Sequence, residues 1–341
     1  MARRTKIRKI PLNIIDFVTK MNLVEPGGPS LGHRTFLKAF YGLALNAEEL
    51  EVYCKATGRT NYLPCEQKEV TAIVGRRGGK TTLASEIAIY EAVRYRKLPR
   101  GARAYVLVVA PVLIQAQIAF EYIQKGFWGS PILKELIVAE RRNRIELRNG
   151  ITIACYPCSY IKLRGVGVVC AICDELGFWG HEESANPEEE VMAALRPAMA
   201  TFPNAKLIKI STPYRKEGIL WNDFQERNNL QHLVWHASTQ EMNPTISADF
   251  FEKARQRDGD EYYRREYLAE FTDSIVGWMP RELLACEVRE SCRQFVAEPT
   301  SRLSTRGSGR AILDLLFYIE LTMDISPSFM QGGGRELGKY P

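Results

Sequence analysis

The stretch "VTAIVGRRGGKTTLASEIAI" at residues 70–89 joins an apolar run to a helical pattern through a glycine-rich turn. The first five residues are mostly β-branched or small, and the apolar residues after Thr82 recur with the spacing of one helix face. Gly78 and Gly79 allow a close approach of the backbone to an anion, and the free amide groups of a helix N-terminus attract one. The stretch therefore predicts a strand, a phosphate-binding turn and a helix.

The usual phosphate-binding motif has a glycine six residues before its lysine, and Val74 stands at that position here. In the motif the lysine reaches the β- and γ-phosphates and the following hydroxyl binds Mg²⁺, which assigns these roles to Lys80 and Thr81. The alternative is a glycine turn without a ligand. The predicted nucleotide-binding residues of the loop are Gly75, Arg77, Gly78, Gly79, Lys80, Thr81 and Thr82.

Three further apolar runs, at 104–110, 168–173 and 206–211, are separated by helical patterns. Near-continuous apolar runs are typical of strands that are buried on both faces of a parallel sheet. We therefore expect a wound α/β fold. Asn149-Gly150 lies between two alternating runs and predicts a hairpin with a two-residue primed turn, inserted between the runs at 104–110 and 168–173.

The pattern along the chain divides it into four parts. Residues 1–60 are expected to be helical, with a basic arm at the start and a helix that ends at Gly58. Residues 61–240 form the predicted core, and 241–285 have the mixed charges and aromatic residues of a helical lid or linker. Residues 286–341 form a polar, glycine-rich tail that is too short for a further domain of ordinary size.

Two polar motifs follow buried strands, where open α/β sheets bind their ligands. Asp174 and Glu175 end the run "VVCAIC", which favours a carboxylate that holds magnesium followed by a general base for an attacking water. Ser211, Thr212 and Pro213 end the run "KLIKI", where a short hydroxyl can sense a terminal phosphate. A helix start and a strand-terminating turn are the respective alternatives.

The overall composition excludes few classes of globular protein. Apolar residues make up 45% of the chain and charged residues 25%, as in ordinary globular proteins. The formal charge of +6 allows a polyanionic partner without requiring one. No apolar run approaches the ~18 residues of a membrane span, and the basic start "MARRTKIRKI" lacks the apolar segment of a secretory signal. We expect a cytoplasmic protein.

The cysteines at 155, 158, 170 and 173 have CxxC spacing and raise the alternative of structural zinc. In a strand, however, residues three apart point to opposite faces, so Cys170 and Cys173 would not share one ion. We favour buried core cysteines.

The ordered set "VGRRGGKTT", "SYIKLRGVGVVCAICDELGFW" and "ISTPYRKEG" resembles the ATPase domain of phage terminase large subunits, from about residue 30 to 280. The resemblance implies a P-loop NTPase core, RecA-like and of the additional-strand type, with ATP and Mg²⁺ as cofactors. It implies Arg76 as an arginine finger, and it matches Ser211, Thr212 and Pro213 to the family's coupling motif. The family's adenine-side glutamine is replaced here, with His33 at a matching position.

The resemblance also implies partners: double-stranded DNA, a small terminase subunit and the portal protein of a procapsid, with a homo-oligomeric ring as the active state in the host cytoplasm. The family's nuclease pattern of spaced aspartates has no match after residue 290, and no nuclease activity is expected from this chain. The alternatives are a related DNA helicase or translocase and a non-hydrolysing DNA-binding or assembly fragment. The hairpin arginines Arg141, Arg142, Arg144 and Arg148 are candidate contacts to DNA phosphates.

Overall fold

The computed structural model describes residues 12–94, 98, 103–158, 166–179 and 187–272. The predicted basic arm, the tail after residue 286 and the end of the predicted lid lie outside these residues, as does the segment "SYIKLRG". None of the helices in the described part is long and apolar enough to cross a bilayer.

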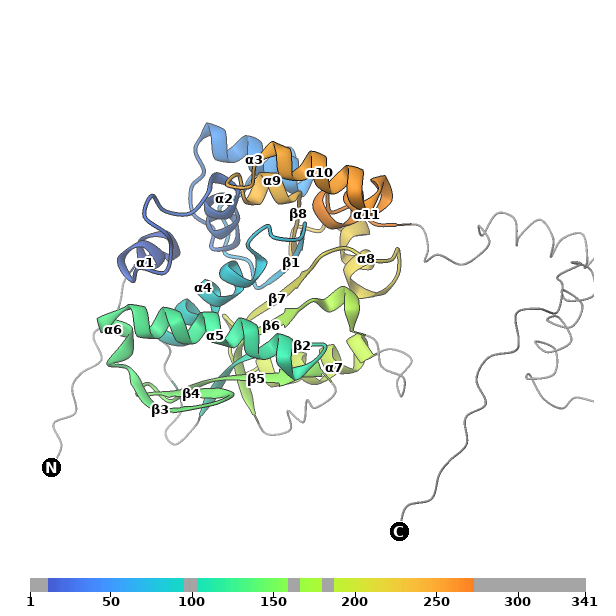
Figure 1. The fold of residues 1–341 in the computed structure, drawn as a ribbon. Helices are drawn as coiled ribbons and strands as arrows, with labels where there is room; N and C mark the ends of the chain where they lie inside the picture. Colours follow the sequence, from blue (N-terminus) through green and yellow to red (C-terminus); the bar gives the residue numbers. More distant parts are fainter. Residues whose placement is uncertain (1–11, 95–97, 99–102, 159–165, 180–186, 273–341) are drawn as a thin grey trace, which may run out of the picture. The chain divides into compact units, whose positions relative to one another are not determined.

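One mixed, mostly parallel sheet of eight strands forms the centre, in the order β3-β4-β5-β2-β6-β7-β1-β8 (Figure 1). Its strands are β1 (Glu69–Val74), β2 (Ala104–Ala110), β3 (Ile137–Arg141), β4 (Arg144–Leu147), β5 (Ile151–Pro157), β6 (Gly167–Asp174), β7 (Lys206–Ser211) and β8 (Leu233–Ala237). All neighbours from β5 to β8 are parallel, whereas β3 and β4 pair antiparallel at one edge. The four strands predicted from apolar runs are confirmed, and the α/β fold with them.

Helices cover both faces of the sheet. Those before the sheet are α1 (Ile14–Lys20), α2 (Leu31–Phe40) and α3 (Ala47–Thr57), and those between strands are α4 (Lys80–Val93), α5 (Leu113–Gly129), α6 (Pro131–Lys134), the 3₁₀ turn η2 (Leu176–Phe178), α7 (Pro187–Met199) and α8 (Gly218–Gln225). After β8 come α9 (Thr239–Met242), α10 (Ala248–Asp258) and α11 (Asp260–Tyr267).

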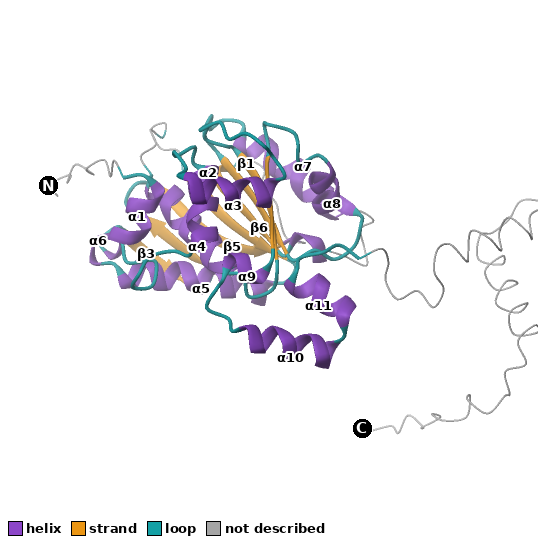
Figure 2. Ribbon diagram, turned by 90° about the horizontal axis from the view of Figure 1, so that it is seen from above, coloured by secondary structure: helices purple, strands orange, loops and turns teal. Residues whose placement is uncertain are grey.

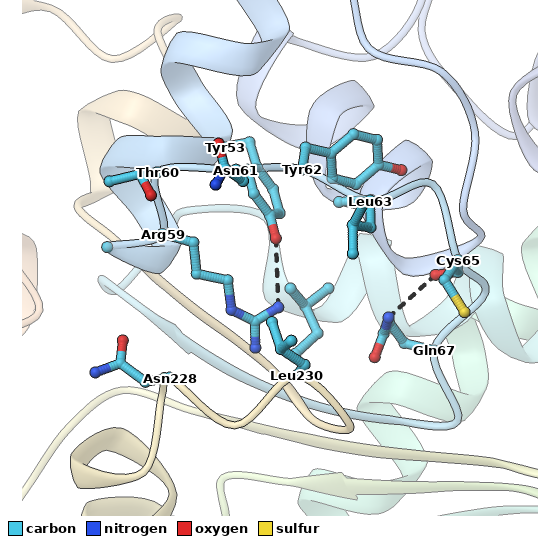
Figure 3. Close-up of a pocket in the computed structure, with 13 residues that line it drawn as sticks. Tyr53, Arg59, Thr60, Asn61, Tyr62, Leu63, Cys65, Gln67, Asn228 and Leu230 are labelled. Carbon is cyan, nitrogen blue, oxygen red and sulfur yellow. Dashed lines mark hydrogen bonds between the residues drawn. The ribbon is translucent and has the colours of Figure 1, made fainter.

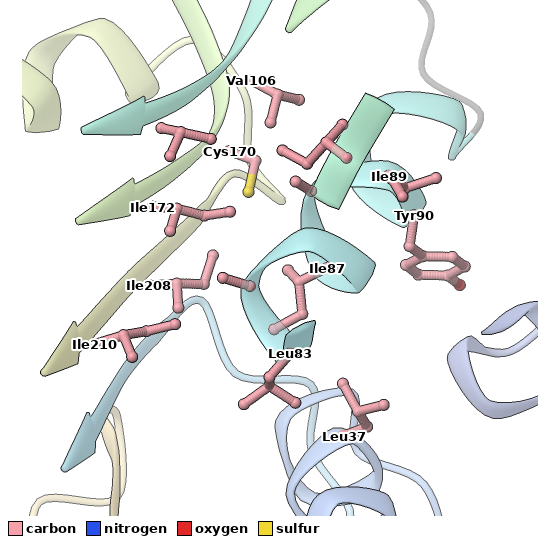
Figure 4. Packing of buried hydrophobic residues seen from close by; sticks show 14 of the residues in the cluster. Leu37, Leu83, Ile87, Ile89, Tyr90, Val106, Cys170, Ile172, Ile208 and Ile210 are labelled. Atoms are coloured by element: carbon pink, nitrogen blue, oxygen red, sulfur yellow. The ribbon is translucent and has the colours of Figure 1, made fainter. Parts of the chain in front are cut away.

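The larger core lies on the face covered by α1 to α5. Figure 4 shows Leu83 and Ile87 of α4 facing Ile172 of β6 and the isoleucines of β7. α7 covers the other face through a second cluster around Leu195 and Leu107. α10 and α11 pack on each other through Phe251 and Tyr267, and Figure 2 shows α10 apart from the sheet.

Glycine turns decide where several of these elements end. Helix α2 ends at Phe40, because the chain turns at Gly42 (φ +68°) where an added Cβ would lie 2.5 Å from the Glu66 nitrogen; the predicted end of the next helix at Gly58 is confirmed by its left-handed φ of 71°. The hairpin at Asn149-Gly150 is confirmed, but the two-residue primed turn is wrong. β4 ends at Leu147, and the Gly150 amide bonds to the Leu147 carbonyl in a three-residue loop with only Gly150 at positive φ.

Candidate functional site

The strand order brings the three sequence motifs to one edge of the sheet. β6, β7 and β1 are parallel neighbours, so their carboxyl ends meet. The glycine-rich loop follows β1, Asp174 ends β6, and Ser211 ends β7. Residues that are about 130 positions apart in sequence, Lys80 and Thr212, are thereby in hydrogen-bonding contact.

The glycine-rich loop has the conformation of an anion cradle. Gly79 caps α4 in the left-handed region (φ 81°), and no side chain caps the helix, so the first amide groups remain available. An added Cβ at Gly78 would lie 2.5 Å from Val74 Cγ1 and 2.9 Å from the Gly75 carbonyl oxygen, so the turn requires glycine there. Arg77 is also left-handed (φ 64°), a strained state for a residue with a side chain.

Lys80 is buried in this loop, with 8% of its surface exposed. Its ammonium donates to the carbonyls of Val74 (3.1 Å) and Gly75 (3.4 Å) and to Thr212 Oγ1 (2.7 Å). The Glu175 carboxylate is farther away, at 3.9 Å. The charge is therefore solvated by neutral oxygens and lacks a close ion pair.

The acidic pair stands beside this ammonium. Burial raises the pKa of Asp174 to about 7, and the Glu175 charge adds to the rise while Lys80 opposes it. Glu175 is left-handed (φ 51°) directly after β6, which turns its side chain toward Lys80 and β7. Burial lowers the pKa of Lys80, whereas the carboxylates of Glu175, Asp174 and Glu266 act in the opposite direction.

The hydroxyl motif touches both other motifs. Thr212 accepts from Lys80 through its hydroxyl, and its amide faces Glu175 Oε2 at 3.4 Å. Ser211 Oγ lies 3.4 Å from the same carboxylate oxygen and accepts from the Gly177 amide at 3.2 Å. All three residues of the motif, including Pro213, are buried. The structure thus joins the phosphate loop, acidic pair and hydroxyl motif in one contact network.

The remaining predicted site residues lie around this network. Thr81 and Thr82 are in the first turn of α4 and partly exposed. His33 lies on α2, and its Nε2 is 2.8 Å from the Glu86 carboxylate of α4 in the core. A contact of His33 with an adenine ring would therefore have to use Nδ1 or the ring face, and it stays a prediction.

Arg76 is exposed on the side of the loop toward α11. Its Nη1 donates to the Tyr262 hydroxyl at 3.2 Å and lies 3.6 Å from Glu266 Oε2. Its amide donates to the Glu266 carbonyl at 2.5 Å, and its carbonyl accepts from the Thr239 hydroxyl at 2.7 Å. The sequence had indicated no role for these partners, although Glu266 lies within residues 30–280, over which the resemblance runs.

The donor set fits a nucleotide and a divalent cation. An ammonium without a close ion pair and an uncapped helix start suit phosphate oxygens. A buried carboxyl at the end of β6 and a hydroxyl in the first turn of α4 are oxygen ligands of the kind that Mg²⁺ prefers. Lys80 and the amides of Gly79 to Thr81 would hold the phosphates, and Asp174 with Thr81 the cation.

The cysteines divide between the two faces of the sheet. Cys155 and Cys170 belong to the core under α4 and α5, whereas Cys158 and Cys173 belong to the cluster under α7. The prediction that Cys170 and Cys173 point to opposite faces is confirmed. Among the described residues, no three histidine, cysteine or acidic side chains gather as metal ligands.

The four hairpin arginines do not form one cluster. Arg141 and Arg142 are exposed at the turn between β3 and β4. Arg144 lies 3.3 Å from the Glu146 carboxylate in an ion pair. Arg148 stands at the other end of β4 and donates to the Glu135 carbonyl at 2.7 Å. The first two are therefore the better candidates for an extended polyanion.

A cavity of about 650 Å³ lies at the other end of the sheet (Figure 3). Its wall includes Gln67, just before β1, and Leu233, the first residue of β8. Arg59 crosses it and donates to the carbonyls of Asn229 (2.7 Å) and His232 (2.6 Å). Because the phosphate loop follows the opposite end of β1, this cavity is separate from the candidate site.

Comparisons with known proteins show a family and similar solved structures. The family model "Terminase large subunit, T4likevirus-type, N-terminal" matches residues 72–285, more than half of the chain. The crystal structure of the HK97 bacteriophage large terminase is similar with a TM-score of 0.56 and 18% identity, over 80% of this chain and 57% of that one. The Thermus phage P74-26 large terminase ATPase domain matches with a TM-score of 0.46 and 20% identity, over 70% of this chain and 98% of that one. No curated protein matches the chain.

Proposed function

We propose that the chain is the ATP-hydrolysing motor of a DNA-packaging machine. It belongs to the T4-type terminase large subunit family and matches the model of the N-terminal part of that subunit. It spans little more than half of the HK97 terminase. The activity, substrate and partners of a whole terminase are therefore part of the proposal.

The observation that carries the proposal is the meeting of Lys80, Glu175 and Thr212. The ammonium is 2.7 Å from the hydroxyl and 3.9 Å from the carboxylate, at the ends of three adjacent strands. One contact network thus joins a cation that can bind phosphate, a candidate base and a hydroxyl that can sense a terminal phosphate. A glycine turn with a purely structural role would not need these three groups together.

Each of these residues has a separate role in the proposed hydrolysis of ATP. Lys80 exchanges its carbonyl partners for phosphate oxygens, and Glu175 orients and deprotonates the attacking water. Thr212 contacts both, so it transmits a change in either to β7 and the chain after it. Mg²⁺, when bound, neutralises charge on the phosphate oxygens, and Asp174 and Thr81 are the residues that would hold it.

A steady-state ATPase assay with and without duplex DNA tests the proposal. We expect Mg²⁺-dependent turnover that duplex DNA stimulates. The Glu175→Gln variant should bind ATP but turn over about 10²–10⁴-fold more slowly, the usual contribution of a positioned general base. Glu121→Gln, on the exposed face of α5, is the matched control and should hydrolyse ATP at the parental rate.

Two results would count against the proposal. If the folded chain hydrolyses no ATP in either condition, the motor function is wrong and a DNA-binding or assembly role gains support. If Glu175→Gln hydrolyses ATP at the parental rate, Glu175 is not the base.

We further propose that duplex DNA is contacted through its phosphates, because a translocating motor must accept any sequence. Arg141 and Arg142 are the exposed candidates on the hairpin. Affinity for random-sequence duplex should then fall steeply with added salt, as counterion release requires. Family membership also supports a small terminase subunit, a portal protein and a ring of like subunits as partners.

A further inference from the structure

Helix α5 is apolar on two opposite faces. Its inner face packs against α4, β2 and β5. The side chains of this face are 2% exposed or less: Ala116, Ala119, Phe120, Ile123 and Phe127. The outer face carries four large apolar residues that are 44% to 70% exposed: Ile114, Ile118, Tyr122 and Trp128. A helix that is apolar all round is normally buried on all sides, so the composition of α5 indicates a partner for its outer face.

The two charged residues of α5, Glu121 and Lys125, lie on the same outer face and are exposed. At 3.6 residues per turn, these two and the four apolar residues fall within about a third of the helix circumference. We call this set of six residues the outer stripe. Within the described part of the chain neither charge has an ion-pair partner, although the Lys125 ammonium lies 5.5 Å from the centroid of the Tyr122 ring. Both charges are therefore available to a partner.

The outer stripe is symmetric about position 123. Glu121 and Lys125 lie two residues before and after that position, and Ile118 and Trp128 lie five residues before and after it. Ile114 has its counterpart in Ile132, which lies nine residues after position 123 on α6 and is 54% exposed. Opposite charges and apolar side chains are thus placed as a self-complementary surface requires.

This symmetry favours one arrangement of two identical helices. When two copies pack antiparallel across a twofold axis, each residue faces the residue at the mirror position of the other copy. Glu121 of each copy then faces Lys125 of the other, and Ile118 faces Trp128. A parallel arrangement in register would instead set Glu121 against Glu121, which is repulsive.

We propose that the outer stripe of α5 is a docking surface for a second copy of this chain, with the two helices antiparallel across a twofold axis at position 123. Burial of the apolar side chains drives the association, and the two charge pairs fix its register. A twofold contact closes after two copies, so this dimer is distinct from the ring of like subunits in the proposed function. It requires neither nucleotide nor DNA.

The size of the stripe sets the strength of the contact. A helix of 17 residues is about 25 Å long and about 10 Å wide, less than a standard interface of roughly 800 Å² per partner. We therefore expect a reversible dimer with a Kd of about 10 µM. At enzyme concentrations well below this Kd the chain is monomeric, so substitutions in the stripe leave the ATPase rate unchanged.

Sedimentation velocity of the full-length chain without nucleotide tests the proposal, from about 1 µM to about 200 µM, because the dimer fraction follows mass action. Lys125→Glu sets carboxylates against carboxylates across the contact, and Glu121→Lys sets ammonium groups against each other. Each should raise the dimer Kd at least about tenfold. Lys253→Glu makes an equal change of charge on α10, where Lys253 is 73% exposed, and should leave the Kd unchanged.

A mixture of the two single variants tests the register. Mixed in equal amounts, Lys125→Glu and Glu121→Lys chains should dimerise with each other, because every ammonium then faces a carboxylate. The double variant that carries both substitutions should recover the parental Kd to within about threefold, for the same reason. Ile118→Asp should leave the chain monomeric, since it places a charge in the apolar part of the contact.

Two results overturn the proposal. A parent chain that remains monomeric at the highest concentration leaves the stripe to a different partner. A dimer or larger assembly that persists in both single variants is built by another surface. Glu121 and Lys125 are exposed in the monomer, so both variants should fold, and a thermal melt equal to that of the parent checks this.

Discussion

Two regions of the same sheet bury lysine side chains, and they differ in how closely carboxylates approach the ammonium. At the carboxyl end of β1, the Lys80 side chain is 7% exposed and its ammonium is bonded to two carbonyls and Thr212, with Glu175 at 3.9 Å. On β7, Lys206 and Lys209 are 1% exposed and each is in contact with carboxylates.

The β7 lysines point to opposite faces and are fully paired. Lys206 lies 2.8 Å from Glu66, and Lys209 lies 2.7 Å from Glu69 and 2.5 Å from Asp223. A buried charge is tolerated when it is paired and hydrogen-bonded. The difference indicates that the β7 lysines serve the fold, and it supports the proposal that Lys80 binds the phosphates of a nucleotide.

The largest effect on nucleotide binding is expected from removal of the Lys80 ammonium. Lys80→Met should weaken ATPγS binding about 100-fold, because a desolvated phosphate would lose its charged partner. The free energy of unfolding should change little, since no carboxylate loses a close partner. Equilibrium binding and urea unfolding of the same sample measure both. A loss of stability as large as that of the β7 variant below would contradict the distinction.

The reverse experiment removes a lysine of the fold. Lys209→Met removes the nearest cation of Glu69 and Asp223 and leaves Glu69 with Arg196 at 3.6 Å. It should lower the free energy of unfolding by about 3 kcal/mol. Lys253→Met, which breaks an exposed pair with Asp249 on α10, is the control and should lower it by less than about 1 kcal/mol. Urea unfolding provides the comparison, and equal losses in the two variants would show that burial of the pair is not decisive.

Glu66, the carboxylate partner of Lys206, gives a smaller and pH-dependent effect on the free energy of unfolding. Burial alone would raise the pKa of Glu66, but hydrogen bonds from Arg94 and Lys206 outweigh it and lower the pKa to about 2 from 4.5. The charged carboxylate thus stabilises the fold fully above pH 4.5, and this contribution is lost as the pH falls toward 2. Because the Glu66 side chain is 34% exposed, we expect about 1–2 kcal/mol after solvent screening.

Glu66→Gln is the variant that isolates this contribution. It should be less stable than the parent by that amount at pH 6, and the gap should narrow at pH 3. Chemical denaturation at both pH values measures it. A gap that is constant with pH would mean that Glu66 acts through packing and not through its charge.

The sheet shows where sequence patterns suffice. The runs at 70–74, 104–110, 168–173 and 206–211 were recognisable because strands buried on both faces need apolar residues at nearly every position. β3 was missed, since an edge strand with an exposed face, such as "IVAER", carries no such run. The turn type at Asn149-Gly150 was also wrong, because Asn149 uses its side chain to bond the Ala92 carbonyl and the Ile151 amide.

In the candidate site, too, sequence patterns predicted some features and missed others. Lys80, the acidic pair at 174–175 and the hydroxyls at 211–212 could be identified from their positions after strands. The contacts of Arg76 with Tyr262 and Glu266 could not, because about 190 residues separate them and no local pattern links a loop to a distant helix. The ion pairs of the β7 lysines were hidden for the same reason, within a strand that otherwise appears apolar.

The sequence by itself determined the four strands that form long apolar runs, the turn that can cradle a phosphate and the side chains proposed to carry the chemistry. These properties depend on residues that are close along the chain, so local spacing and side-chain type decide them. Only the tertiary structure decided that β6, β7 and β1 are neighbours, that Lys80 lacks a close carboxylate and that α11 holds Arg76. Those outcomes depend on the order of strands in the sheet and on the partners available within a few ångströms, which no single stretch of sequence specifies.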